Sequence, residues 1–433
     1  MKKIEERPNR RTHCLVCGRR LPESALLEFD GMPASAQNIP DAEEVEKDRG
    51  MDLSLYQCRH CGLVQFDCEP VDYYRDVIRS GGFSTTMVEL RRSQYRHLIE
   101  KYGLEGKKLV EAGCGQGEFL KVLTEFPVQA YGVEHRADLV RKAREQGLCV
   151  TEGFTETPDT RLGENGPYDG FLSFNFLEHQ PEPGVMLDCI RANVKDGGIG
   201  LITVPSLEYI LKYDGYYELI RDHIAYYSFE TLRNLLELHG FEVLEEEMVN
   251  RDTCSVIVRK LADGAGETGR ESESEIGGTG RESEAGNARE PRVGSRTMTP
   301  ADVSALAASR SRIEGELEEL TGRLEAEGKT FAIWGASHQG FTLAATTCLG
   351  RKAAYIIDSA PFKQGRFAPA SHLLIAPPEH FYTHPVEMIL IVAPGYTREI
   401  ADSIRSRFGD RVEIMTLRSD HLETLDAEGD TKI

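Results

Sequence analysis

Four cysteines near the N-terminus have the spacing of metal ligands. Cys14 and Cys17 form one Cys-x-x-Cys pair, Cys58 and Cys61 form a second, and a glycine follows each pair. Two such pairs can place four thiolates tetrahedrally around Zn²⁺ at ~2.3 Å, and each glycine lets the backbone turn towards the metal. Because a site closed by four cysteines leaves no open position for a substrate, the spacing predicts a structural zinc ion. The alternative is four buried cysteines in unrelated hairpins.

A glycine-rich turn indicates a second binding site. Gly113, Gly115 and Gly117 follow a short apolar segment and precede a predicted helix, where glycines let the backbone approach a ligand closely. Glu111 precedes these glycines, and Glu134 ends the next predicted strand, where a carboxylate can accept both ribose hydroxyls. This arrangement favours an adenosyl cofactor without a pyrophosphate; a dinucleotide is the alternative.

The segment Phe174-Asn-Phe-Leu-Glu-His179, followed by Pro183, resembles the sequence after the fourth strand of class I methyltransferases. The resemblance implies S-adenosylmethionine as the cofactor and adds Asn175 to the candidate cofactor-binding residues above. In this resemblance Glu178 and His179 mainly shape the loop beside the cofactor, and a catalytic role for the pair is the alternative.

An Asp-His pair is the candidate for proton transfer. Asp222 and His223 lie in a loop between the fifth predicted strand and a helix predicted over residues 230–239. An unactivated carbon can accept a methyl group only after a base removes a proton made acidic by an adjacent carbonyl. His223 is the candidate base; the alternative is a core histidine that closes the loop against Tyr226 and Phe229.

Alternating strands and helices must position these residues. Strands are predicted over residues 108–111, 130–134, 168–173 and 200–204, and helices over 88–102, 137–146 and 186–194. Short apolar strands that each precede a helix predict an α/β fold with a parallel, doubly wound sheet.

The C-terminal third predicts a second Rossmann-like unit. A helix of roughly 25 residues is predicted from Val303, ending near Gly328, and apolar strands are predicted over 330–335, 354–358 and 388–393. Residues 262–299 contain almost no large apolar side chains and predict a disordered acidic linker. The predicted parts are therefore a zinc module (1–84), a methyltransferase domain (85–261), this linker, and a helix with a C-terminal domain (300–433).

Length and charge restrict the class of protein. The 433 residues exceed one ordinary core, and the net charge of −20 disfavours nucleic acid as a partner. We expect no membrane segment, because no apolar run approaches the ~18 residues that span a bilayer. The N-terminus lacks the apolar stretch of a secretory signal, so a cytoplasmic enzyme is expected.

Over nearly its whole length the chain resembles the three-domain, zinc-containing sugar C-methyltransferases. The C-terminal landmarks are Trp334-Gly-Ala-Ser-His-Gln-Gly340 and Asp358-Ser-Ala-Pro-Phe-Lys-Gln-Gly-Arg366. The resemblance implies a zinc-binding N-terminal domain, a central cofactor domain and a C-terminal domain that closes over a nucleotide-linked keto-deoxysugar. It also implies that His223 removes the proton beside the keto group.

Three positions differ from the family pattern. Ile220 and Asp222 stand where the family has a tyrosine and a glutamate before the histidine, and Ile78 stands where a second tyrosine is expected. Asp222 is expected to orient His223 as the glutamate would. Two other functions stay open: methyl transfer to oxygen or nitrogen of another sugar or small molecule, and a non-catalytic zinc-containing binding protein.

Overall fold

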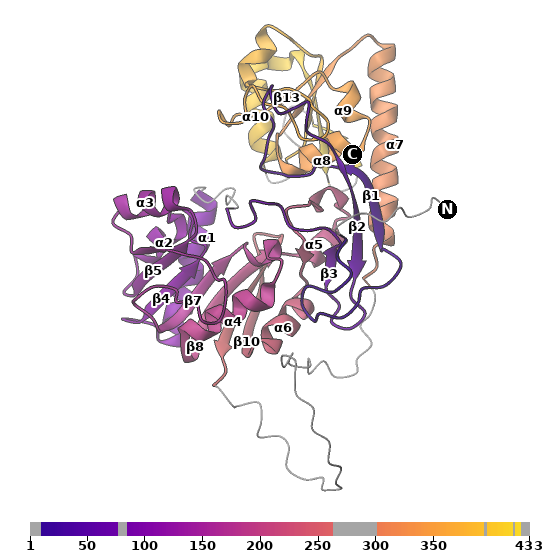
Figure 1. The fold of residues 1–433 in the computed structure, drawn as a ribbon. Coiled ribbons are helices and arrows are strands. Elements are labelled where there is room, and N and C mark those ends of the chain that lie inside the picture. Colours follow the sequence, from indigo (N-terminus) through magenta and orange to yellow (C-terminus); the bar gives the residue numbers. More distant parts are fainter. Residues whose placement is uncertain (1–9, 77–84, 263–300, 394–395, 419–420, 426–433) are drawn as a thin grey trace.

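The computed structural model describes residues 10–76, 85–262, 301–393, 396–418 and 421–425 (Figure 1). It has a small N-terminal module, a central α/β domain and a C-terminal α/β domain that stands above the other two in this view. The predicted linker, apart from residue 262, and Ile78 lie outside the described residues.

The N-terminal module is built on an antiparallel sheet in the order β1-β2-β3-β9. Its strands are β1 (Leu27–Met32), β2 (Met51–Gln57), β3 (Val64–Phe66) and β9 (Ala225–Tyr226). The fourth strand comes from the sequence predicted to lie wholly in the central domain, and Val64 pairs with Tyr226. The loop that carries Asp222 and His223 is therefore held directly against the N-terminal module.

The central domain contains a seven-stranded sheet in the order β10-β11-β8-β7-β4-β5-β6. Its strands are β4 (Lys108–Ala112), β5 (Gln129–Glu134), β6 (Val150–Glu152), β7 (Tyr168–Phe174), β8 (Val194–Pro205), β10 (Phe241–Val249) and β11 (Thr253–Lys260). Its helices are α1 (Thr85–Tyr102), α2 (Glu118–Leu123), α3 (Ala137–Glu145), α4 (Pro183–Asn193), α5 (Leu207–Lys212) and α6 (Phe229–Leu238), with 3₁₀ turns η1 (Leu177–His179) and η2 (Tyr216–Glu218).

Strand order places a ligand crevice at the carboxyl end of β4. This strand pairs in parallel with β5 on one side and with β7 on the other, so the connections leave it in opposite directions. The strands that were predicted, β4, β5, β7 and β8, pair in parallel as expected, whereas β11, which was not predicted, runs antiparallel to both β8 and β10. A tight hairpin at residues 250–252 reverses the chain there.

The C-terminal domain has a second sheet of similar design, in the order β14-β13-β12-β15-β16-β17. Its strands are β12 (Phe331–Trp334), β13 (Ile356–Ile357), β14 (Ile375–Ala376), β15 (Met388–Ile391), β16 (Glu413–Arg418) and β17 (His421–Thr424). Its helices are α7 (Ser304–Ala326), α8 (His338–Thr346), α9 (Leu349–Lys352) and α10 (Thr397–Phe408), with 3₁₀ turns η3 (Pro378–Tyr382) and η4 (Gly409–Arg411). Only β17 among these strands is antiparallel to its neighbour.

Helix α7 joins all three parts (Figure 1). Arg310 donates to the carbonyl of Glu28 in β1 at 3.2 Å, and Ser309 donates to the carbonyl of Asp214 in the central domain at 2.7 Å. The buried face of the helix enters a single apolar cluster that also contains residues of β1, η2 and α8. None of the described helices is both long enough and apolar enough to cross a membrane.

Truncation of the buried face of α7 tests this shared core. Leu317 is 1% exposed, so we expect Leu317→Ala to lower the free energy of unfolding by about 2 to 5 kcal/mol through lost burial and a cavity. Urea denaturation measures the change. Glu318→Ala, at an exposed position of the same helix, is the control and should stay within about 0.5 kcal/mol of wild type. An equal effect of both variants would contradict a core role for Leu317.

Candidate active site

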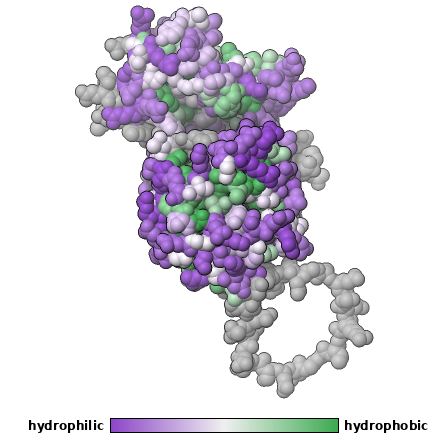
Figure 2. All heavy atoms as spheres, turned by 90° about the vertical axis from the view of Figure 1, so that its left-hand side faces the viewer, coloured by the Kyte–Doolittle hydropathy of each residue, from purple (hydrophilic) through white to green (hydrophobic). Residues whose placement is uncertain are grey.

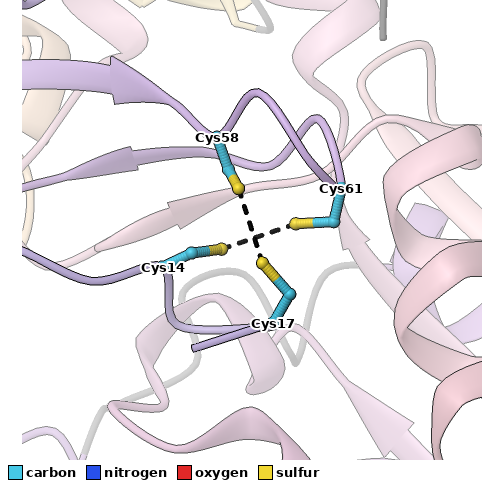
Figure 3. A group of neighbouring side chains, drawn as sticks. All are labelled: Cys14, Cys17, Cys58 and Cys61. Carbon is cyan, nitrogen blue, oxygen red and sulfur yellow. Dashed lines mark hydrogen bonds between the residues drawn. The ribbon is translucent and has the colours of Figure 1, made fainter. Parts of the chain in front are cut away.

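The four predicted ligand cysteines come together in two matching knuckles (Figure 3). Cys14 Sγ lies 3.4 Å from Cys61 Sγ, and Cys17 Sγ lies 3.5 Å from Cys58 Sγ. All four sulfur atoms lie within 4.8 Å of one another. Four thiolates this close repel one another unless a cation lies among them, so the cluster fits a metal of the zinc type.

The backbone of each knuckle repeats the same hydrogen bonds. The amide two residues after Cys14 and that two residues after Cys58 each donate to the cysteine sulfur at 3.4 Å. Gly18 and Gly62 then turn the chain with φ values of 66° and 78°, a region that glycine enters at no steric cost. The glycine after each Cys-x-x-Cys pair thus has the conformation that the sequence predicted.

A cavity of about 240 Å³ lies at the carboxyl ends of β4, β5 and β6. It is lined by Arg75, Gly113, Gly115, Gln116, Glu118, Val133, Glu134, His135, Arg136, Leu139, Lys142, Gly153, Phe154, Thr155, Phe174, Asn175 and Phe176. Figure 2 shows apolar residues gathered on the face of the central domain, below the C-terminal domain. Four of the six predicted cofactor residues, Gly113, Gly115, Glu134 and Asn175, are therefore part of one cavity wall.

Backbone donors fix the carboxylate of Glu134. The amide of Gly115 donates to Oε2 at 2.8 Å, and the amide of Arg136 donates to Oε1 at 2.9 Å. Each carboxylate oxygen keeps a second lone pair that can accept a hydroxyl proton. The glycine turn and the acidic residue therefore form one unit, in which the turn holds the acceptor in place.

Glu111 and Gly117 do not line the cavity. Glu111 is fully buried behind the turn. Gly117 begins α2 with φ 90°, and a Cβ added there would lie 2.2 Å from Leu148 Cδ1. The structure thus gives Gly117 a backbone and packing role, whereas the sequence predicted direct cofactor contact for both residues.

The chain after β7 connects the cavity wall to the histidine pair. Asn175, with φ 48°, donates its amide to the carbonyl of Thr203 at 2.8 Å and accepts from the Thr203 hydroxyl at 2.8 Å. Two residues later η1 begins, and it ends at His179, whose ring lies 4.7 Å from that of His223, edge to face. The sequence favoured a role for His179 in shaping the loop, and the structure also brings it to His223.

His223 is held as a neutral imidazole. Burial lowers its pKa well below the ordinary value, and the nearby His179 and His338 lower it further. Burial also lowers the pKa of His179, whose Nδ1 donates to the backbone carbonyl of Asp222 at 2.7 Å. A neutral His223 has a ring nitrogen ready to accept a proton.

The predicted contact between Asp222 and His223 was wrong. The Tyr73 hydroxyl donates to Asp222 Oδ2 at 2.6 Å, and the amide of Ala36 donates to Oδ1 at 2.7 Å. Within the described residues no hydrogen bond joins this carboxylate to the His223 ring. Asp222 instead fastens the loop to the N-terminal module, and burial beside this carboxylate raises the pKa of Tyr73 well above its ordinary value.

Sequence families match two parts of the chain. The family described as "Methyltransferase domain" matches residues 87–246, and that described as "C-methyltransferase C-terminal domain" matches residues 280–414. Over 399 residues the chain is 26% identical to C-methyltransferase NovU of Streptomyces niveus, which covers 90% of this chain and 91% of that protein. The chain is an S-adenosylmethionine-dependent methyltransferase, and it is similar to a C-methyltransferase over most of its length.

Other methyltransferases match shorter parts of the chain. Ubiquinone biosynthesis O-methyltransferase of Methylococcus capsulatus is 29% identical over 99 residues, which are 22% of this chain and 42% of that protein. Among solved structures, magnesium protoporphyrin IX methyltransferase of Synechocystis with bound S-adenosylmethionine aligns with a TM-score of 0.32 and 15% identity, over 44% of this chain and 88% of that one.

Several side chains of the candidate site were not predicted. Arg75, Phe154 and Phe176 line the cavity, and Tyr73 binds Asp222. Arg91 of α1 is 1% exposed, with its guanidinium 3.8 Å from the centre of the Phe174 ring. A buried arginine on an amphipathic helix has no sequence signal, and the aromatic residues lie in loops whose packing depends on distant segments.

The protonation of His223 can be measured directly. We expect its pKa to lie below the ordinary 6.5, so the ring stays neutral at pH 6.5. Because the unfolded chain binds this proton more tightly than the folded one, His223 lowers stability as pH falls below about 6.5. Long-range ¹H–¹⁵N spectra of the imidazoles, assigned with His223→Asn, follow the titration. A midpoint at or above 6.5 would contradict the expected burial effect.

Proposed function

We propose that the protein transfers a methyl group from S-adenosylmethionine to the carbon beside the keto group of a nucleotide-linked deoxysugar, with His223 as the base. The observation that carries the proposal is the edge-to-face pair of His223 and His179, which lies on the chain that continues from the cavity wall at Asn175 and Phe176. When bound, S-adenosylmethionine supplies an electrophilic methyl group. The residues of the chain must bind it and create a nucleophilic carbon.

Glu134 is the proposed acceptor for the two ribose hydroxyls of the cofactor. Its carboxylate is already oriented by the amides of Gly115 and Arg136, so little conformational freedom is lost when the ribose binds. Gly113 has no side chain to fill the space in front of the Phe176 ring, to which an added Cβ would come within 3.5 Å. The cavity therefore fits an adenosyl group beside the glycine turn.

His223 is proposed to take the proton from the carbon beside the keto group. The electron pair left on that carbon is delocalised onto the carbonyl oxygen and makes the carbon nucleophilic. A base acts best when it is uncharged at the working pH, and burial keeps His223 uncharged. His179 lies against its ring, and its bond to the Asp222 carbonyl holds both rings in one geometry.

The C-terminal domain supports a nucleotide-linked acceptor. Asp358, directly after β13, accepts from the amide of Ala336 at 3.0 Å and from that of Ala360 at 2.8 Å. This repeats the arrangement at Glu134, again with one donor from the turn after a central strand and one from two residues beyond the acid. Lys363 lies 3.2 Å from Asp358 and supplies a positive charge at the same edge.

Two other functions have different requirements. Transfer to oxygen or nitrogen needs no keto group in the acceptor and no proton exchange at carbon. A non-catalytic binding role predicts no methyl transfer to any acceptor. The Glu134 unit counts against a non-catalytic role, and the histidine pair favours carbon methylation over transfer to oxygen or nitrogen.

The four cysteines are proposed to bind one structural zinc ion. Cys14, Cys58 and Cys61 are buried, and the cluster lies apart from the cofactor cavity, none of whose lining residues is a cysteine. The metal would hold together the module that contributes Ala36 and Tyr73 to the base loop.

Removal of one thiolate should release this metal. We expect Cys58→Ser to lose about one equivalent of zinc and to unfold at a lower temperature, because a structural zinc site contributes folding free energy. Elemental analysis of the purified protein measures the metal. Cys149→Ser, at an exposed cysteine, should keep the zinc content of wild type. Unchanged zinc in Cys58→Ser would overturn the assignment.

Deuterium exchange tests the base. The protein is incubated in deuterated water with a set of nucleotide-linked 4-keto-deoxysugars, with and without S-adenosylmethionine, and mass spectrometry follows deuterium uptake and methylation. We expect His223→Asn to lower both rates by at least about 10²-fold, the usual contribution of a general base, while cofactor affinity stays unchanged. His97→Asn, an exposed histidine paired with Glu245, is the control.

Two outcomes would count against the proposal. Near-normal exchange in His223→Asn would remove His223 from the mechanism. Methyl transfer by wild type to an acceptor without a keto group, with no exchange on any keto sugar, would move the function to oxygen or nitrogen methylation.

A further inference from the structure

Residues 70–76 of the N-terminal module extend across to the central domain. Within this segment, the Tyr73 hydroxyl donates a hydrogen bond to Asp222, in the loop that carries His223. The next two residues reach the cofactor cavity instead. The Tyr74 ring lies 6.2 Å from the Phe154 ring, edge to face, and the Arg75 guanidinium lies 4.7 Å from the centre of the same ring.

Arg75 is part of the cavity wall. Among the described residues that line the cavity, it alone comes from outside residues 113–176. Its Nε donates to the Tyr74 hydroxyl at 3.0 Å, and its Nη1 donates to Glu156 Oε1 at 3.0 Å. Two hydrogen bonds in different directions fix the plane of the guanidinium, so Arg75 is positioned rather than loosely exposed.

The topology identifies which end of the cavity Arg75 closes. Glu134 ends β5, whereas Phe154 and Thr155 follow β6, the next strand towards the sheet edge. With the ribose on Glu134 and the methionine part towards the glycine turn after β4, the adenine must point towards the Phe154 side. Phe154 is also in edge contact with His135 at 5.8 Å and with Phe176 at 5.8 Å.

We propose that Arg75 is a cofactor-binding residue, whose guanidinium forms with Phe154 the wall against which the adenine packs. The N-terminal zinc module thereby completes the cofactor site of the central domain. This inference rests on the proposed position of S-adenosylmethionine in the cavity.

The chemistry of Arg75 suits a neutral aromatic base. A guanidinium is flat and weakly hydrated, and it stacks favourably on aromatic faces. Its charge is balanced by Glu156 at 3.0 Å, so the pair does not repel the positively charged sulfonium of the cofactor. An apolar residue in its place would keep some contact area but lose both the ion pair across the two domains and the stacking plane.

Calorimetric titration of the full-length, zinc-loaded protein tests the proposal. S-Adenosylhomocysteine and adenosine are the two probes, because they share the adenine and differ in the amino-acid tail. We expect Arg75→Ala to lower the affinity for both probes by the same factor of about tenfold, within the usual range for loss of a stacking partner. Arg233→Ala removes an exposed arginine that is paired with Glu246, away from the cavity, and should bind both probes as wild type does.

The results separate a wrong role for Arg75 from a wrong position of the cofactor site. Unchanged affinity in Arg75→Ala, or a loss for S-adenosylhomocysteine alone, would overturn the adenine contact. Glu134→Ala serves as the comparison for the cofactor site itself: if it also binds both probes normally, the proposed cavity is at fault and not only Arg75. If Arg75→Ala does not fold, Arg75→Lys keeps the pairing with Glu156 but lacks the flat guanidinium. It should still lower the affinity for adenosine severalfold.

Discussion

The buried carboxylate of Asp222 fixes the geometry on which the candidate active site depends. A carboxylate that is 3% exposed is costly unless its oxygens are hydrogen-bonded, and both bonds here come from the N-terminal module, through Tyr73 and the amide of Ala36. The backbone carbonyl of the same residue accepts a hydrogen bond from His179 Nδ1. One residue thus connects the N-terminal module, the loop that carries His223 and the chain that leaves the cavity.

The same dependence extends to the packing of the three parts. The strand that follows His223 completes the N-terminal sheet, and a single apolar cluster includes residues of β1, η2, α7 and α8. Glu218 of η2 also accepts a hydrogen bond from Gln339 at 2.7 Å. It lies 3.2 Å from His338, the first residue of helix α8 in the C-terminal domain. The sequence therefore divides into three domains, but all three supply side chains near His223.

Local signals in the sequence predicted much of this structure. The Cys-x-x-Cys pairs, the glycine turn with Glu134, and the strands of both Rossmann-like sheets depend on short spacings and periodicity, which a sequence displays directly. The partner of Asp222 could not be predicted in this way, because Tyr73 lies far away in the chain and neighbouring side chains in a turn can face different partners. For the same reason Arg75 and Phe154 carried no signal, and the two-residue strand β9 was too short to show a pattern.

The contacts of α7 have a consequence for how the chain holds together. This helix follows residues 263–300 in sequence, yet it bonds to Glu28 of the first module and Asp214 of the second, and Glu316 accepts the amide of Leu422 in the third. Each of these bonds is independent of the peptide link between the central and C-terminal domains. We therefore expect a chain cleaved in that link to keep its two fragments associated through the buried face of α7.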